Sequence, residues 1–276
     1  TFVVGSSPED GGATLEYSIT VRAIDLATWG SGSISNPAFD AAQWQIAVSA
    51  NGASWFAVPD IGYEIEIHPW KSTDSGATWT ELTSAGKRGW DWISCDADGS
   101  VVVAESYLAG AYYLHVSTDG GGTWANPVLL NASSPVELAM SDDGSSMYVS
   151  AHLATAAGGF ASTDEALFAS HDSGATWTAT LDMTQEERGA ETDTTYDDLY
   201  YDHIAASSDG TVVVLGGYST FDYGGIFVSL DSGATWTERH FGAGRPVDDL
   251  SLSGDAAGLA IVSIFDVEIS HDLGVT

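Results

Sequence analysis

Basic residues, cysteine and long apolar runs are all scarce in this chain of 276 residues, and each scarcity excludes something. Lys and Arg number only 7 against 39 Asp and Glu, which gives a formal net charge of −32. Phosphate backbones and anionic lipids require the opposite sign, so we predict no nucleic-acid partner and no binding to a membrane surface. Such an excess of acid keeps a protein soluble in salt, which favours a high-salt or marine environment.

The lone cysteine, Cys95, excludes an internal disulfide and a cysteine-based zinc site. Its surroundings, WISCDADG, predict a buried strand position. No apolar run approaches the roughly 20 residues of a membrane span, so no membrane insertion is expected. The first residues lack the basic and apolar parts of a signal peptide. Because the chain opens on Thr1 and the last copy of a repeated motif is cut at Thr276, we expect part of a larger chain or assembly.

What the chain has in abundance is one repeated motif, S-x-D-x-G-x-T-W, which we call the box. Complete copies begin at Ser72, Ser117, Ser170 and Ser229, and a truncated copy begins at Ser270. The Asp carboxylate can accept N–H bonds within a tight turn, and the Gly can adopt a positive φ. The indole can cover the apolar side of a hairpin. We therefore predict structural roles for the following box residues: Asp74, Trp79, Asp119, Trp124, Asp172, Trp177, Asp231, Trp236 and Asp272.

A second motif precedes each box: a strand-like run, a turn such as Asn-Gly or Asp-Gly, and another strand-like run. Aligning the copies superposes one apolar residue from each first strand, which predicts a buried face. These residues are Ile46, Ile93, Leu138, Ile204 and Leu250. Each repeat unit therefore holds four antiparallel strands, with the box between the third and the fourth.

The spacing of the boxes predicts the architecture. Successive box Asp residues are 45, 53, 59 and 41 residues apart, a period typical of β-propeller blades. A fainter copy, DGGATL from Asp10, predicts an additional blade at the N-terminus. We predict one all-β propeller domain over residues 1–276, with six or seven four-stranded antiparallel blades. The repeat is weakest over residues 1–43.

The boxes resemble the Asp-box, or bacterial neuraminidase, repeats of sialidases. Similar boxes occur in xyloglucan-cleaving glycoside hydrolases, sortilin-type receptor propellers and a photosystem II assembly factor. The resemblance covers most of residues 44–276 and implies the propeller fold, but a fold does not carry a function. Sialidase activity, which requires arginines that bind the substrate carboxylate, is disfavoured. The N-terminal Arg-Ile-Pro motif of that family is absent, and the net negative charge of the chain repels anionic sugars. The photosystem assembly factor is associated with a basic patch that faces its partner. It is disfavoured because this chain has too few Lys and Arg residues to form such a patch.

Ligands of propellers bind at the mouth of the central channel, where the inner strands begin. The alignment places there Trp44, Asp91, Trp92, Glu137, Asp202, His203, Asp248 and Asp249, which we call the mouth residues. Tryptophans can stack on sugar rings. A carboxylate pair, for which Asp91 and Asp249 are the candidates, would suit inverting hydrolysis of a neutral polysaccharide. The same residues could instead hold a ligand or a cation without catalysis.

Two weaker sites complete the inventory. The acidic segment 191–203 offers oxygen ligands for Ca²⁺, but its spacing does not fit an EF-hand and an exposed acidic loop is favoured. Asn131 begins an N-glycosylation sequon, which matters only in a eukaryotic secreted protein. No motif demands a cofactor or a metal.

The sequence thus favours a non-catalytic binding or structural module of an extracellular or surface-exposed protein. Its partner would be a glycan or another protein. The alternatives are a glycoside hydrolase acting on a neutral polysaccharide and a propeller like the photosystem assembly factor.

Overall fold

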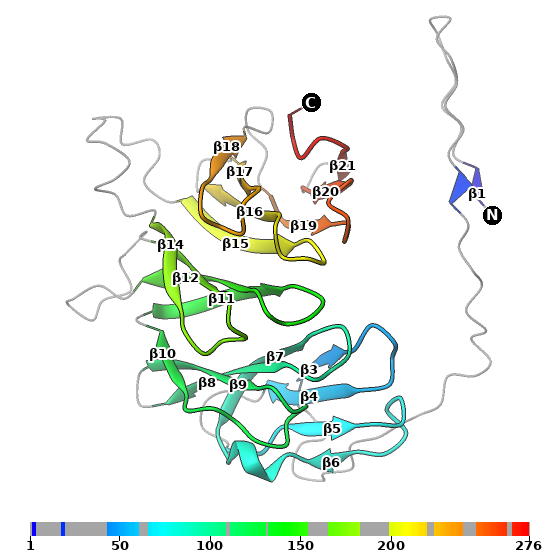
Figure 1. The fold of residues 1–276 in the computed structure, drawn as a ribbon, viewed down its shortest axis with the longest axis vertical. Helices are drawn as coiled ribbons and strands as arrows, with labels where there is room; N and C mark the ends of the chain where they lie inside the picture. Colours follow the sequence, from blue (N-terminus) through cyan, green and yellow to red (C-terminus); the bar gives the residue numbers. More distant parts are fainter. Residues whose placement is uncertain are drawn as a thin grey trace, which may run out of the picture.

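In the computed structural model, the regular secondary structure of the described residues consists of β-strands and one 3-10 turn (Figure 1). The turn is η2 (Thr83–Ala85), and the described residues contain no α-helix. The described ranges are 2–3, 18–19, 43–60, 66–108, 111–130, 132–153, 165–182, 199–219, 224–239, 247–263 and 267–275.

The strands form five successive antiparallel sheets, which we call blades 1 to 5, and a separate pair, β1 (Phe2–Val3) with β2 (Ser18–Ile19). Blade 1 contains β3 (Gln43–Val48), β4 (Trp55–Asp60), β5 (Trp70–Ser72) and β6 (Thr80–Glu81). Blade 2 contains β7 (Gly89–Cys95), β8 (Val102–Leu108), β9 (Ala111–Ser117) and β10 (Val128–Leu130). Blade 3 contains β11 (Ala132–Met140), β12 (Met147–Leu153), β13 (Glu165–Ser170) and β14 (Thr178–Asp182). Blade 4 contains β15 (Leu199–Ala206), β16 (Val213–Ser219), β17 (Gly224–Ser229) and β18 (Thr237–Arg239). Blade 5 contains β19 (Asp249–Leu252), β20 (Leu259–Val262) and β21 (Val267–Ser270).

Within each blade, the strands pair in chain order as a meander. Blades 1 to 4 have four strands each, with the box between the third and the fourth, as the sequence predicts. The predicted total of six or seven blades also depends on residues outside the described ranges, including the box-like segment from Asp10.

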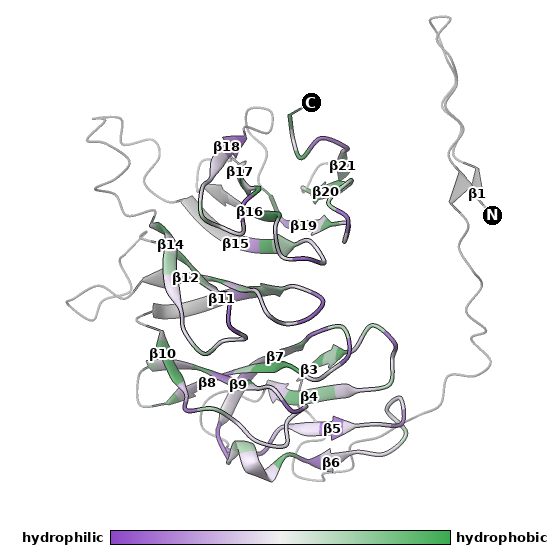
Figure 2. Cartoon of the chain, in the orientation of Figure 1, coloured by the Kyte–Doolittle hydropathy of each residue, from purple (hydrophilic) through white to green (hydrophobic). Residues whose placement is uncertain are grey.

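The core consists of four apolar layers, one between each pair of consecutive blades. The layer between blades 1 and 2, for example, packs Phe56 and Val58 of β4 against Val102 and Ala104 of β8. Figure 2 shows hydrophobic residues concentrated along the strands and hydrophilic residues at many of the turns. Each blade therefore buries apolar side chains on both faces wherever it has two neighbours.

The predicted buried face of the first strands is observed in the later blades and differs in blade 1. Ile93, Ile204 and Leu250 are 7%, 5% and 8% exposed, and Leu138 packs partly buried against the layer between blades 2 and 3. Ile46, at the equivalent position of β3, is 51% exposed. Blade 1 is the first of the five blades, so no blade precedes it in the described part of the chain, and no described residue buries this face.

A ladder of backbone hydrogen bonds joins all five blades at the turn between the first and second strands. The Ala50 N–H donates to the Ala97 carbonyl at 2.8 Å, and Ala97 donates to Asp142 at 2.9 Å. Asp142 donates to Ser208, and Ser208 to Gly254, both at 2.8 Å. This ladder fixes how far each blade can slide along the next, so the first strands of all blades are held in a common register.

The box is a compact hydrogen-bonded turn, and its geometry repeats from blade to blade. In blade 3, the Ser170 hydroxyl accepts the Gly174 N–H at 2.8 Å and donates to Asp172 Oδ1 at 2.8 Å. Asp172 then accepts the N–H and the hydroxyl of Thr176, at 2.8 and 2.6 Å. These bonds lower the pKa of Asp172 to about 2, with the Thr176 hydroxyl as the largest cause. The predicted structural role of the box Asp is consistent with these contacts.

The box backbone turns left-handed at two consecutive residues. The Gly has φ of +84°, +87°, +80°, +83° and +78° in blades 1 to 5, as the motif predicts. The preceding residue is also left-handed, and in blades 1, 3 and 4 it is a serine. Tryptophan completes the turn in blades 1, 3 and 4, where its indole N–H donates to the Gly carbonyl. Trp124 of blade 2 differs, because its buried Nε1 finds no partner in the described part of the chain, and its ring centroid lies 6.3 Å from that of Trp90.

Candidate ligand-binding mouth

The boxes lie at one end of the blades, away from the mouth residues. In blades 2 to 4 the residue before the box glycine donates to the turn between the first and second strands. These bonds run from Gly120 to Ser100, from Ser173 to Ser145 and from Ser232 to Thr211. That turn follows the end of each inner strand. The sequence predicts the mouth residues where the inner strands begin, and this holds for β3 and β19, but in β7, β11 and β15 they lie in the middle of the strand because these strands begin earlier. The boxes are therefore separated from the mouth residues by the second half of the inner strands.

The common register places the mouth residues at two aligned positions of the inner strands. Trp44 lies on β3, Asp91 and Trp92 on β7, Glu137 on β11, Asp202 and His203 on β15, and Asp249 on β19, with Asp248 directly before it. Trp92, Glu137, His203 and Asp249 each precede the aligned apolar residue of their strand. The sequence alignment thus identified equivalent positions in neighbouring blades.

Three inner strands carry a β-bulge at these positions, which the sequence did not predict. The register with the second strand shifts between Trp90 and Ile93 in β7, and between Pro135 and Glu137 in β11. A third shift lies between Tyr200 and His203 in β15. Bulges bend a strand and re-aim its side chains, and they are frequent next to functional sites. Their recurrence in three consecutive blades makes the mouth the best candidate site.

Glu137 and His203 form a link between blades 3 and 4. Glu137 Oε2 accepts the backbone N–H of Ile204 at 2.9 Å and lies 3.6 Å from His203 Nδ1. The side chains of Glu137 and His203 are 42% and 24% exposed. One carboxylate oxygen of Glu137 is therefore used to hold the inner strand of the next blade in place.

The acids of blade 5 lie at the surface. Asp248 and Asp249 are both exposed. Asp249 Oδ1 accepts the N–H of Leu250 at 2.8 Å, and the Asp248 N–H donates to Val262 at 2.8 Å. Asp249 therefore caps the start of its own strand and still faces solvent.

A buried carboxyl behind Asp91 is the most unusual group near the mouth. Glu105 on β8 is 1% exposed, and its Oε1 has no hydrogen-bond partner among the described residues. Burial and, secondly, the negative charge of Asp91 raise the pKa of Glu105 to about 9, although the Trp92 indole opposes this shift. Glu105 is therefore protonated at neutral pH. Sequence analysis did not identify this residue, because a lone Glu in an apolar strand, VVAESYL, was its only signal.

A second buried polar group of blade 2, His115, lies with Trp90 on the opposite face of the sheet from Glu105, toward blade 1. His115 is 2% exposed, contacts the Ser106 hydroxyl at 2.8 Å and packs edge-on against Trp90 with ring centroids 4.9 Å apart. Burial, followed by the charge of Arg88, lowers the pKa of His115 to about 4. The imidazole is therefore neutral near pH 7.

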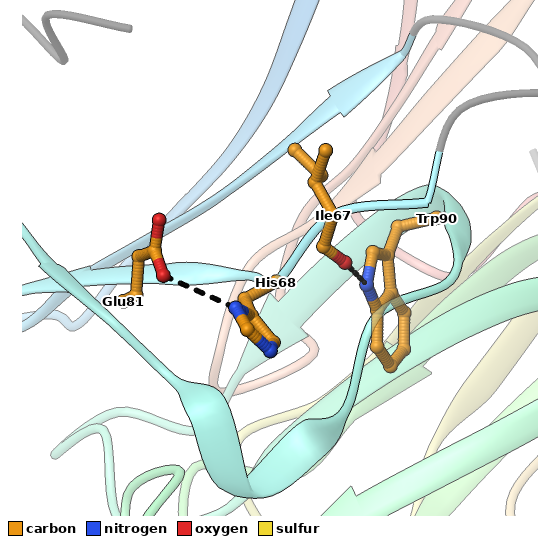
Figure 3. A network of polar contacts seen from close by, with 4 residues as sticks. All are labelled: Ile67, His68, Glu81 and Trp90. Atoms are coloured by element: carbon orange, nitrogen blue, oxygen red, sulfur yellow. Dashed lines mark hydrogen bonds and ion pairs between the residues drawn. The ribbon is translucent and has the colours of Figure 1, made fainter.

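Blade 1 supports the start of β7 through residues 67 and 68 (Figure 3). The Trp90 indole N–H donates to the Ile67 carbonyl at 2.8 Å, and Ile67 and Arg88 exchange backbone hydrogen bonds. His68 Nδ1 lies 3.1 Å from Glu81 Oε2. These contacts fix the backbone that leads into Asp91 and Trp92.

Glu105 should make stability depend on pH. Folded Glu105 holds its proton up to about pH 9, whereas the unfolded carboxyl loses it near 4.5. Folding therefore takes up a proton between these values, and the free energy of unfolding falls as pH rises through that window. We expect Glu105→Gln to flatten this decline in urea unfolding measured across the window. The exposed Glu66→Gln is the control, and parallel wild-type and Glu105→Gln profiles would contradict the assignment.

Several predicted features lie outside the described residues. These are Asn131, most of the acidic segment 191–203 and the side chain of Asp202. In the ranges that are described, no group of three or more His, Cys, Asp or Glu is arranged to hold a metal ion. None of those ranges forms a helix long and apolar enough to cross a membrane. Cys95 ends β7, is partly buried, and has a pKa raised to about 11, mainly by burial.

Solved structures with the same fold are β-propellers. A family 74 glycoside hydrolase of Niastella koreensis matches with TM-score 0.59 and 18% identity, over 84% of this chain and 36% of that one. YCF48 of Cyanidioschyzon merolae matches with TM-score 0.53 and 14% identity, over 84% and 68%. A putative TolB of Agrobacterium tumefaciens matches with TM-score 0.56 and 13% identity, over 85% and 79%.

At such identities the likeness shows the fold alone, and it confirms the predicted all-β propeller. The chain spans about a third of the family 74 hydrolases that it matches. No family model and no curated protein sequence matches this chain.

Proposed function

We propose that this chain is a non-catalytic binding module, and that the mouth residues form its ligand-binding surface. The ligand is a neutral glycan or a protein segment. The module needs no cofactor for this role and belongs to a larger extracellular or cell-surface protein, in line with its solubilising charge.

The observation that carries the proposal is that the mouth carboxylates accept hydrogen bonds from the protein backbone. Glu137 bonds the backbone of Ile204 in the next blade, and Asp249 caps its own strand. Glu105, whose raised pKa would suit a general acid, is 1% exposed and lies behind the surface. A general acid must reach the proton acceptor on its substrate within hydrogen-bond distance. The arrangement therefore supports binding better than hydrolysis.

Aromatic side chains near the mouth suit a sugar ligand. Trp44 and Trp92 are partly exposed at aligned positions of blades 1 and 2. Tyr107 and Tyr112, paired across β8 and β9, lie at the same end of blade 2 with ring centroids 4.8 Å apart. Aromatic faces pack on the apolar faces of sugar rings, while exposed acids such as Asp248 accept hydroxyl hydrogen bonds.

The test combines binding with product analysis. The purified chain is assayed against immobilised neutral β-glucans, with and without EDTA, and the same glycans are examined for new reducing ends. We expect binding without release of reducing sugar. Asp249→Asn should weaken binding roughly tenfold, which corresponds to about 1.4 kcal/mol. Asp255→Asn, an exposed acid of blade 5 at the opposite end, should not.

Three outcomes would change the assignment. Reducing sugar formed by the wild type and lost in Asp91→Asn or Asp249→Asn would establish the hydrolase alternative. Binding reduced equally by Asp249→Asn and Asp255→Asn would show a general charge effect and remove the mouth as the site. Loss of binding in EDTA would add Ca²⁺ to the ligand site.

A further inference from the structure

The bulge of β7 connects two mouth residues to one buried carboxyl group. The pairing of β7 with β8 passes over Asp91 and Trp92 on one strand and over Glu105 on the other. At a bulge, two residues of one strand oppose a single residue of its partner. Asp91 and Trp92 are partly exposed, whereas Glu105 is buried. The residues of blade 2 that can meet a ligand therefore lie in front of Glu105.

Glu105 and Trp92 lie in the apolar layer between blades 2 and 3. Glu105 pairs with Leu114 of β9, whose side chain belongs to this layer, and Trp92 packs against the same layer. The residues that blade 3 contributes to the layer, among them Val149, are apolar. Among the described residues, Asp91 is the charged group that acts on Glu105. An ionised Glu105 would therefore meet apolar neighbours and a second negative charge.

Two polar atoms at this point are buried without a hydrogen-bond partner in the described ranges: Trp92 Nε1 and Glu105 Oε1. They are close neighbours, because the Trp92 indole opposes the rise in the pKa of Glu105. The indole N–H is thus turned inward to the carboxyl group, while part of Trp92 remains exposed. Buried polar atoms without full hydrogen bonds lower stability, so their presence here indicates a functional reason.

Blade 3 has a buried hydroxyl group at the equivalent place. Ser150 of β12 and Glu105 each lie one residue beyond the partner of the aligned apolar residue. Ser150 is 3% exposed, its Oγ lacks a hydrogen-bond partner among the residues described, and it pairs with Glu137 at the bulge of β11. Blade 4, also with a bulge, has a glycine at this position. Blades 1 and 5 pair without a register shift, and they have Val58 and Val262 there. A buried polar group therefore accompanies the bulge in blades 2 and 3.

We infer that Glu105 is a positioning residue of the mouth, whose carboxyl group holds Asp91 and Trp92 in the arrangement that meets a ligand. The inference rests on the proposed function, and it gives Glu105 no contact with the ligand itself. Below about pH 9, Glu105 keeps its proton and the arrangement is intact. Above that pH, a second negative charge beside Asp91 should displace both mouth residues and weaken ligand binding.

Fluorine NMR of the full chain, labelled with 5-fluorotryptophan, tests the positioning without a ligand. We expect the Trp92 resonance, assigned by its loss in Trp92→Phe, to titrate at about pH 9 in the wild type. This titration should disappear in Glu105→Gln and persist in Ser106→Ala. Ser106 is the matched control, because it is the next residue of β8, is equally buried, and contacts His115 on the opposite face. A Trp92 resonance that does not titrate, or that still titrates in Glu105→Gln, would overturn the inference.

The affinity for a neutral β-glucan oligosaccharide tests the consequence for binding. Near neutral pH, Glu105→Gln should bind within about twofold of the wild type, because an amide also donates and accepts hydrogen bonds. Glu105→Leu should bind roughly tenfold more weakly. Raising the pH from about 7 to about 10 should weaken wild-type binding roughly tenfold and leave Glu105→Gln unchanged. Parallel pH profiles of these two proteins would contradict the positioning role, and this comparison still decides if Glu105→Leu does not fold.

The two measurements separate this inference from the proposed function. If no glucan binds while the Trp92 resonance titrates with Glu105, the glycan function fails and the positioning role stands. If glucan binds while the resonance does not respond to Glu105, the mouth remains the binding surface and the positioning role fails.

Discussion

Gly174→Ala should lower the free energy of unfolding by about 2–5 kcal/mol, measured by urea denaturation. Gly174 has φ of +80°, where an L-residue costs about 1–2 kcal/mol. A Cβ at this position would also lie 2.6 Å from Cγ2 of Val116 in the preceding blade. Forcing an extra methyl group into a packed interface costs a further ~1–3 kcal/mol. The box glycine of blade 3 therefore serves both its own turn and the contact with blade 2.

Gly76→Ala separates these two contributions. Gly76 has φ of +84°, but its Cβ would meet only Trp55 of its own blade, at an ordinary 3.4 Å. We expect this variant to lose about 1–2 kcal/mol, the conformational part alone. Val116→Ala should partly rescue Gly174→Ala and not Gly76→Ala. Equal losses in the two glycine variants would show that the contact between blades contributes nothing.

Trp90→Ala should be the most damaging change near the mouth, with a loss of about 3–5 kcal/mol in the free energy of unfolding. Trp90 is 2% exposed, packs in the layer between blades 1 and 2, and donates to the Ile67 carbonyl. Removal of the indole leaves a cavity beside the neutral His115. Because Trp90 precedes the bulge that carries Asp91 and Trp92, we also expect weaker ligand binding.

Trp90→Phe distinguishes packing from hydrogen bonding. It keeps an aromatic ring, and the Ile67 carbonyl still accepts the Arg88 N–H at 3.0 Å. We therefore expect a loss of only ~1–2 kcal/mol, measured by the same urea denaturation. A Trp90→Phe variant as unstable as Trp90→Ala would mean that the indole N–H, rather than packing, dominates this site.

The features that the sequence predicted well are local. Asp172, Thr176 and Gly174 lie within one turn, so the motif itself specifies their hydrogen bonds. The hairpins, the four-stranded units and the all-β propeller class follow from alternation, turn residues and a repeat period. These signals act between neighbours in the chain, which is why no tertiary information was needed.

The sequence alignment also predicted which positions of the inner strands are equivalent, but not what their side chains contact. Glu137 contacts Ile204, which is 67 residues away and in another blade. Asp91 and Glu105 come together because a bulge shifts the register of β7 against β8. Neither a bulge nor a contact between blades leaves a mark in the strand periodicity.

By itself, the sequence determined the turns, the strands and their grouping into blades, because each box and each hairpin carries its own hydrogen-bonding residues. The tertiary structure alone decided which faces are buried and which acids are ionised. Ile46 and Ile93 occupy the same repeat position, yet one is exposed and the other buried, because only Ile93 has a preceding blade against it. Glu105 is protonated because the packing of blades 2 and 3 removes it from water, a condition set by residues far away in the chain.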